Sequence, residues 1–188
     1  NSTFHQWQID QLKKNLIENQ GDANRTRLTL AQRLNEGAFY DEAIETLHSI
    51  NSPGIKTSLE YNESLATAFI YSGQTDRAMK LLREMQDRFS DSKEITSWRA
   101  WLLLSMPESD AKLEAQELAE TLVKDNPSVD NLGLLGLALK ANKEWSRAEK
   151  VLLKALEKAY HVHYTYRYHL KQVQDALKAQ NIASLAES

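Results

Sequence analysis

A cluster of histidines and tyrosines near the C-terminal end has residue types that could do chemistry. The stretch AYHVHYTYRYH, residues 159–169, holds four of the chain's seven tyrosines and three of its five histidines. Three histidines could bind a metal ion, and several aromatic rings could stack on nucleic-acid bases. Ordinary packing at a turn between helices is the third interpretation.

The spacing of the histidines argues against a metal site. His161 and His163 are two residues apart, and His169 follows six residues later, with no acidic residue among them. Helical metal ligands are usually three or four residues apart, so that both side chains share a face. We therefore expect ordinary loop and helix histidines, with no metal and no other cofactor.

Other catalytic patterns are absent from the sequence. It contains no phosphate-binding loop, no G-x-S-x-G, no H-E-x-x-H and no cysteine. Carboxylate pairs such as Asp41 and Glu42 come at expected helix starts, where negative charge interacts favourably with the helix dipole. We expect a protein that is not an enzyme.

Composition and charge narrow the classes of partner. The chain has 188 residues, a net charge of -3 and 41% hydrophobic residues, which is typical of a folded soluble protein. Nucleic acids and anionic membranes need an excess of Lys and Arg, so we expect neither as a partner. No apolar run approaches the roughly 20 residues of a membrane helix. The chain starts at Asn1 rather than Met, so a cytoplasmic and a periplasmic location both stay open.

Internal repeats give the organisation of the chain. Residues 30–47, 65–82 and 135–152 align, and each copy begins with Leu followed by a small residue. An alanine follows twelve residues after the small residue, which gives the pairs Ala31 and Ala43, Ala66 and Ala78, and Gly136 and Ala148. Apolar residues three and four apart on both sides of a short turn predict two helices in each copy. The small residues would let these two helices approach closely.

A fourth copy lies between the second and third. Its small residue, Ala100, and its alanine, Ala115, are 15 residues apart, which is three more than in the other copies. We expect these three residues in the turn, where Pro107 ends the first helix and Ser109 or Asp110 caps the second. Gly73 and Gly37 are expected turn residues in the other copies.

The pattern resembles the tetratricopeptide repeat (TPR) family, whose signature is W-x2-L-G-x2-Y, followed by alanines, an aromatic residue and a closing proline. The alanines of successive copies are 35, 37 and 33 residues apart, and Pro127 matches the closing proline. The leading aromatic slot is filled instead by Arg27, Asn62, Thr96 and Leu132. The resemblance covers about residues 24–162. It implies an all-α, right-handed α-solenoid of about four helix-turn-helix repeats with flanking terminal helices.

The resemblance gives the following organisation. We expect an N-terminal helix at residues 1–23, which is a cap or half-repeat. Four repeats follow at residues 24–58, 59–92, 93–128 and 129–162, and the third carries the three-residue insertion in its turn. Residues 163–188 are expected to form a C-terminal capping helix and tail. Trp7, Leu12 and Leu16 are expected on one side of the first helix. Tyr166 stands in the leading aromatic slot and should pack against the preceding helix pair, and Tyr160 stands in the slot of the closing proline.

The first helices of such repeats line a concave groove. By register the groove residues are Arg25, Gln32, Asn35, Glu60, Glu63, Thr67, Tyr71, Ser97, Trp101, Leu137, Lys140, Tyr164, Arg167 and Lys171. Trp101 either anchors a partner peptide or, with Trp98, fills space between repeats. The family's chaperone-binding carboxylate clamp needs several Lys and Asn in the groove, and most of those places are acidic or neutral here, so we do not expect one.

The resemblance implies a protein-protein interaction module, a scaffold or adaptor that binds a peptide or helix of a partner in the groove. Two alternatives stay open. The chain could be a self-associating scaffold that forms a homo-oligomer. It could also be an accessory domain of a larger bacterial envelope-assembly protein, for pilus assembly, polysaccharide export or cytochrome maturation.

Overall fold

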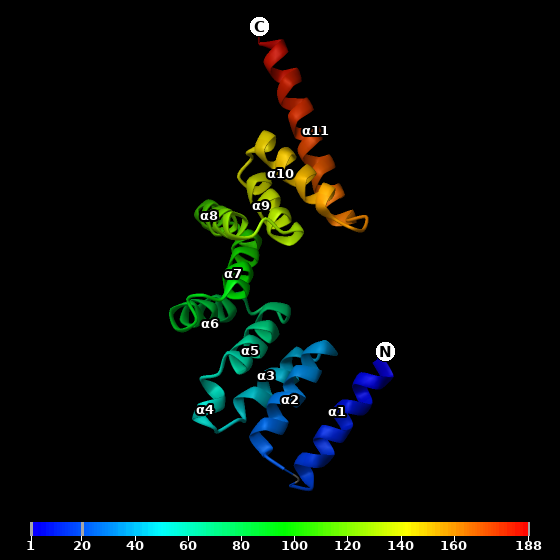
Figure 1. The fold of residues 1–188 in the computed structure, drawn as a ribbon, viewed down its shortest axis with the longest axis vertical. Coiled ribbons are helices and arrows are strands. Elements are labelled where there is room, and N and C mark those ends of the chain that lie inside the picture. Colours follow the sequence, from blue (N-terminus) through cyan, green and yellow to red (C-terminus); the bar gives the residue numbers. More distant parts are fainter. Residues whose placement is uncertain (1, 20, 188) are drawn as a thin grey trace. The chain divides into compact units, whose positions relative to one another are not determined.

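The computed structural model describes residues 2–19 and 21–187, and this part of the chain contains eleven helices and no strand. The chain divides into two compact units, Asn1–Asp91 and Ser92–Ser188. Most helices that follow one another in the chain pack against each other within each unit (Figure 1). The all-α prediction is confirmed.

Unit 1 contains six helices in its described residues. They are α1 (Ser2–Ile17), α2 (Ala23–Glu36), α3 (Tyr40–His48), the short α4 (Pro53–Lys56), α5 (Leu59–Tyr71) and α6 (Thr75–Arg88). Helix α2 packs against α1, α3 and α5, and α5 packs against α6. The two hairpins, α2 with α3 and α5 with α6, therefore meet through their first helices and through the contact of α3 with α5.

Unit 2 contains five helices in its described residues. They are α7 (Lys93–Ser105), α8 (Ser109–Asp125), α9 (Val129–Ala141), α10 (Trp145–Lys158) and α11 (Tyr164–Ala186). The hairpin of α7 with α8 packs against the hairpin of α9 with α10, and α11 packs mainly against α10. Its buried core includes Ala100, Ala119, Leu132, Leu139, Leu152 and Val173.

Capping side chains start the first helix of each hairpin. The hydroxyl groups of Ser58, Ser92 and Ser128 accept hydrogen bonds from backbone N–H groups in the first turns of α5, α7 and α9. The Asp22 carboxylate does the same for α2. Each such cap satisfies a backbone donor that the helix leaves free and contributes about 1 kcal/mol. The sequence therefore determines where the first helices begin.

Small residues occupy the helix crossings, as the repeat pattern predicts. Ala31, Ala43, Ala66, Ala78 and Ala148 are fully buried. A Cβ added to Gly136 would lie only 2.5 Å from Cδ2 of Leu152, so α9 and α10 could not keep this separation with a larger side chain. The small residues thus set the distance between paired helices.

The three extra residues of the third repeat do not lie in its turn. The connections 37–39, 72–74, 106–108 and 142–144 are equal in length, so the extra residues lengthen the start of α8, where Ala111 is buried. Placed within a helix, they keep their backbone hydrogen bonds, which a longer turn would leave unpaired. Ser109 and Asp110 are helical residues and not caps, because the helix is preceded by Glu108, whose side chain makes no capping bond.

The side of α1 that packs against α2 differs from the expected one. Ile9 is buried and Leu12 and Leu16 are half-buried, but Trp7 is 58% exposed and stacks on Phe4 with ring centroids 6.2 Å apart. Ile9, Leu12 and Leu16 are three, four and seven residues apart and share a face, whereas Trp7 lies two residues before Ile9 and points to the other side.

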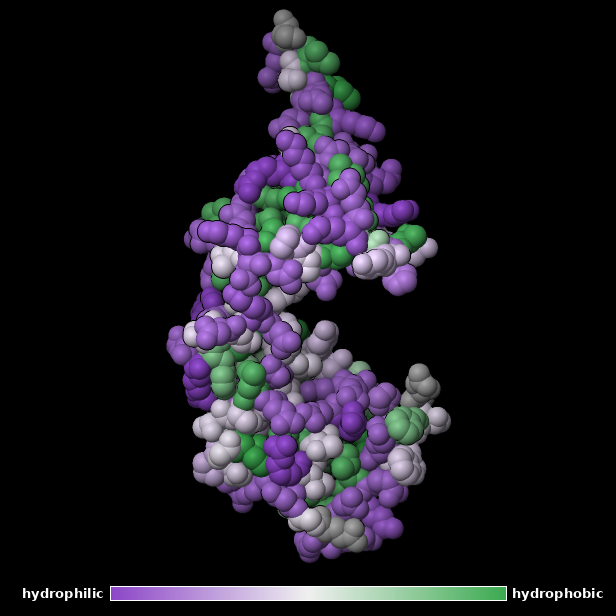
Figure 2. Space-filling view, in the orientation of Figure 1, coloured by the Kyte–Doolittle hydropathy of each residue, from purple (hydrophilic) through white to green (hydrophobic). Residues whose placement is uncertain are grey.

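Helix α11 packs by Tyr166, as predicted, together with Leu170 and Val173. A Cβ on Gly133 of α9 would lie 1.9 Å from Cζ of Tyr166, so the ring rests directly on the backbone of α9. The last turns of α11 extend past α10 (Figure 1). Ile182 and Leu185 are exposed there and give hydrophobic surface near this end of the chain (Figure 2). Tyr160, in the slot of the closing proline, is fully exposed in the connection before α11.

Candidate functional site

The three histidines of residues 159–169 have different surroundings. His161 is exposed, His163 stacks on Tyr166 with centroids 3.8 Å apart, and the ring of His169 contacts Lys140 of α9. Among the described residues no group of three or more acidic or histidine side chains could hold a metal ion. The cluster is mainly the junction between α10 and α11.

In unit 1, the expected groove residues bind one another across α2 and α5. The Glu60 carboxylate accepts a hydrogen bond from Gln32 at 3.0 Å and lies 3.5 Å from Nη1 of Arg25. The Asn35 amide donates to the backbone carbonyl of Ser64 at 2.9 Å. Glu63 and Thr67 are half-buried on the same helix as Glu60. These polar groups therefore hold neighbouring first helices together, although the buried side-chain oxygen of Asn35 has no hydrogen-bond partner among the described residues.

One expected groove residue of unit 1 remains an open contact point. Tyr71, at the end of α5, is 67% exposed and stacks on Tyr40 of α3 with centroids 5.5 Å apart. Because the stack fixes one side of the ring, the other side presents a rigid aromatic surface to solvent.

In unit 2, the first helices form a surface that we call the α7–α9–α11 face. It consists of Trp101 on α7, Leu137 and Lys140 on α9, and Tyr164, Tyr168 and Lys171 on α11. Trp101 and Leu137 directly follow the buried small residues Ala100 and Gly136, and Lys171 directly follows the buried Leu170 at the equivalent position. Equivalent positions of stacked repeats lie side by side, so these three residues form a row. Ser97 is half-buried one helical turn before Trp101.

The exposure of this row is uneven. Trp101 is 43% exposed and Tyr164 is 80% exposed, whereas Leu137 packs partly against the core. A large aromatic side chain that is only half covered keeps apolar area available for a partner. The alternative for Trp101, space filling between repeats, accounts for its buried half only.

Lys140 links α9 to α11. Its amino group lies 2.8 Å from Nδ1 of His169 and donates a hydrogen bond to Oε1 of Gln172. Gln172 in turn donates to the hydroxyl oxygen of Tyr168 at 2.9 Å. Burial lowers the pKa of Lys140, and burial followed by the positive charge of Lys140 lowers the pKa of His169.

Arg167, another expected groove residue, is exposed on α11. Arg167 and Gln174 are seven residues apart on α11 and therefore share a face. Gln174 donates a hydrogen bond to Glu149 of α10 at 3.1 Å, so this is the α10 side of the helix. Arg167 also lies four residues before Lys171 of the α7–α9–α11 face, so its place in the groove stays a prediction.

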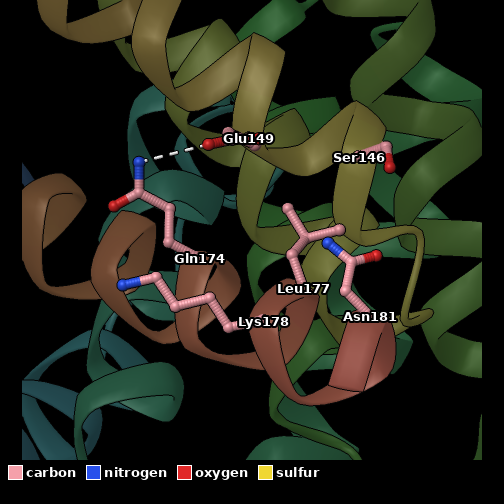
Figure 3. A pocket seen from close by; sticks show the side chains of 6 residues that line it. All are labelled: Ser146, Glu149, Gln174, Leu177, Lys178 and Asn181. Carbon is pink, nitrogen blue, oxygen red and sulfur yellow. Dashed lines mark hydrogen bonds between the residues drawn. The ribbon is translucent and has the colours of Figure 1, made fainter. Parts of the chain in front are cut away.

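A cleft of about 530 Å³ lies between α10 and α11 (Figure 3). Its lining residues are Ser146, Glu149, Gln174, Leu177, Lys178 and Asn181. The Gln174–Glu149 hydrogen bond crosses one end of the cleft, and Leu177 supplies the single large apolar side chain of this lining. Binding sites usually combine an apolar lining with a few converging polar groups. This cleft is mostly polar, so the α7–α9–α11 face is the stronger candidate.

The sequence did not predict the hydrogen-bonded cluster of Lys140 with His169, Gln172 and Tyr168 on the α7–α9–α11 face. Tyr168 and Gln172 are four residues apart, a spacing that indicates a shared helix face but not which neighbour it meets. Their relation to Lys140 depends on how α11 rotates against α9, and Tyr166 on Gly133 fixes that rotation.

In the described part of the chain, no helix has both the length and the apolar character needed to span a bilayer. No family model and no curated protein matches the sequence.

Solved structures resemble the chain in fold. MamA, residues 41 to the end, from Desulfovibrio magneticus RS-1 is 18% identical with a TM-score of 0.73, over 87% of this chain and 90% of that one. A tetratricopeptide repeat protein from Parabacteroides merdae ATCC 43184 is 13% identical with a TM-score of 0.75, over 95% and 70%. A thermophilic TPR protein in Thermus thermophilus is 13% identical with a TM-score of 0.65, over 90% of each chain. The fold is therefore TPR-like, as the repeats predicted.

Proposed function

We propose that this TPR-like chain is a non-enzymatic protein-protein interaction module that captures a peptide or helix of a partner protein. The observation that carries the proposal is the half-exposed Trp101 in a row with Leu137 on the α7–α9–α11 face. Tryptophan contributes most to binding when a partner covers it, because it buries a large rigid area at a low entropic cost.

Unit 1 supports the proposal in a smaller way. Its polar groove residues are engaged with one another, as the bonds of Glu60 to Gln32 and Arg25 illustrate. Tyr71, stacked on Tyr40, is the one large aromatic side chain of the expected groove there that stays mostly exposed. We propose that unit 1 contributes a secondary aromatic contact, while unit 2 contributes the main anchor.

An immobilised array of short random-sequence peptides, probed with the fluorescently labelled chain, tests the proposal. Trp101→Ala should strongly reduce binding to the peptides that the wild type selects, and Tyr71→Ala should reduce it less. Neither substitution removes a buried core residue, so helicity measured by circular dichroism should stay unchanged.

The matched control is Tyr160→Ala. Tyr160 is fully exposed but lies in the connection before α11 and is not one of the residues of the α7–α9–α11 face. Its loss should leave binding intact. If the wild type selects no peptide, or if Trp101→Ala and Tyr160→Ala have equal effects, peptide capture on this face is refuted.

A second candidate function, self-association, is favoured by a different observation. Phe4 and Trp7 on α1 stack on each other and are each 58% exposed. A second copy of the chain could cover this apolar pair. Light scattering over a range of concentrations should then show a larger species that Phe4→Ala with Trp7→Ala returns to the monomer, whereas a wild-type chain that stays monomeric throughout removes this candidate.

A further inference from the structure

The cluster of Lys140, His169, Gln172 and Tyr168 on the α7–α9–α11 face has a fixed direction of hydrogen bonding. An ammonium group has three donors and no acceptor, so both of its contacts, to Nδ1 of His169 and Oε1 of Gln172, are made by donation. When Nδ1 of His169 accepts this hydrogen bond, it is the unprotonated nitrogen and the imidazole proton lies on Nε2. Both groups that receive hydrogen bonds from Lys140 are therefore neutral.

The hydrogen bonds keep the same donor-to-acceptor direction along α11. Because the carbonyl oxygen of Gln172 receives a hydrogen bond from Lys140, its amide nitrogen is directed to the hydroxyl oxygen of Tyr168, at 2.9 Å. The hydroxyl hydrogen of Tyr168 then remains available for an outside acceptor. Two donors are left over in the cluster: the third N–H of Lys140 and the O–H of Tyr168.

The charge around the cluster is positive and not neutralised. Among the residues that the structure describes, Lys140 and Lys171 form no ion pair. Asp130 lies ten residues before Lys140, about 15 Å along α9. Asp175 is exposed on α11, three residues after Gln172, and none of its contacts joins it to Lys140. A half-buried ammonium group with only neutral partners is stabilised by any carboxylate that can reach it.

We propose that this cluster receives the carboxylate of an aspartate or glutamate side chain in the bound partner segment, with Lys140 and the hydroxyl of Tyr168 as the donors. The inference rests on the proposed capture of a peptide by this face. The partner is therefore an acidic segment whose apolar side chain covers Trp101 and whose carboxylate reaches Lys140. Burial lowers the pKa of Lys140, which agrees with an amino group that lacks a negative neighbour.

A peptide array with matched charges tests the inference. Each random-sequence peptide is immobilised in three versions that differ only at their charged positions, which carry Asp and Glu, Asn and Gln, or Lys. The wild type should bind the acidic version about tenfold more tightly than the amide version, as a charge-assisted hydrogen bond allows. Raising the salt concentration should reduce this preference, because charge interactions are screened.

Two variants and one control locate the effect. Lys140→Met keeps the length of the side chain and should abolish the preference for acidic peptides, and Tyr168→Phe should reduce it. Lys150→Met removes an exposed lysine of α10, away from the face, and should keep the full preference. Thermal unfolding checks that each variant is folded.

The outcomes separate the two proposals. The acidic-partner inference is wrong if the acidic and amide versions bind the wild type equally, or if Lys140→Met keeps the preference for acidic peptides. In that case peptide capture still stands as long as Trp101→Ala weakens binding to every version. If Trp101→Ala has no effect on any version, or no version binds, peptide capture is wrong and the inference is wrong with it.

Discussion

At the scale of single residues, the turns hold backbone conformations that ordinary side chains rarely adopt. Ala38, Gly73 and Lys143 lie seven residues after the buried small residue of their repeats and have φ of 64°, 78° and 61°. Only glycine adopts this left-handed conformation without a steric cost. The sequence revealed this position at Gly73 alone, and in the first repeat it pointed to Gly37, whose φ is -84°.

The first prediction concerns this strain. Lys143→Gly should raise the free energy of unfolding by about 0.5–1 kcal/mol, since glycine relieves the cost of positive φ. Gly73→Ala should lower it by a similar amount. Urea unfolding followed by circular dichroism measures both changes.

Gly54 provides the matched control for that pair. It lies in α4 with nothing near its Cβ position and without a positive φ, so Gly54→Ala should be neutral or slightly stabilising. A loss of stability on Gly54→Ala equal to that on Gly73→Ala would show that backbone conformation is not the cause.

The second prediction concerns pH and His169. Its pKa is lowered in the folded state, first by burial and then by Lys140, so below about pH 6.5 the unfolded chain binds more protons at this residue. The stability contribution of neutral His169 is thus full above that pH and is lost as pH falls toward the lower, folded pKa. His169→Gln should make the thermal unfolding temperature less dependent on pH between about 7.5 and 5.5. An unchanged dependence would contradict a lowered pKa of His169 in the folded chain.

At the scale of helices, the contact of α11 with α9 depends on one glycine. The ring of Tyr166 occupies the space in which any other residue at position 133 would place its Cβ. The repeat register predicted that Tyr166 packs against the preceding hairpin. It did not predict Gly133, because no local pattern shows which residue of α9 the ring meets.

The third prediction follows from this contact. Gly133→Ala should lower the free energy of unfolding by about 1–3 kcal/mol, because the added methyl group displaces the Tyr166 ring. Tyr166→Ala should cost more, since it leaves a cavity in the core. The double variant should lose less than the sum of the two, as expected for residues in contact. Strictly additive losses would contradict the contact.

The scale of helices shows most clearly which parts of the structure could be predicted from the sequence and which could not. The burial of Ala31, Ala66, Ala100 and Gly136 follows from repeat spacing, because spacing along a helix determines which residues share a face. The bonds of Gln32 and Arg25 to Glu60, and of Lys140 to Gln172, join helices far apart in sequence. They depend on the rotation and offset of neighbouring helices, which the spacing does not determine.

At the scale of the whole molecule, unit 2 contains a core cluster of its own. The core of unit 2 is formed by residues from Ala100 to Val173, all of which belong to α7–α11. The repeat pattern continues from residue 24 to residue 162 and gave no reason to divide the chain at Asp91. The repeat pattern describes contacts within a helical hairpin, whereas the division into two units depends on contacts between hairpins.

The fourth prediction concerns unit 2 by itself. Residues 92–188, produced alone, should be helical, unfold cooperatively in urea and bind the same array peptides as the whole chain, because both the core and the α7–α9–α11 face lie within this unit. An unfolded product, or a folded one that binds none of these peptides, would show that the face is incomplete without unit 1.

The most direct test of partner capture is the solution affinity of the best array peptide for three full-length chains: the wild type, Trp101→Ala and Tyr160→Ala. If Trp101 is the main anchor, its loss should cost about 2 kcal/mol, roughly a thirtyfold weaker affinity, while the loss of the fully exposed Tyr160 should leave the affinity unchanged. Equal affinities for all three chains would contradict capture on this face.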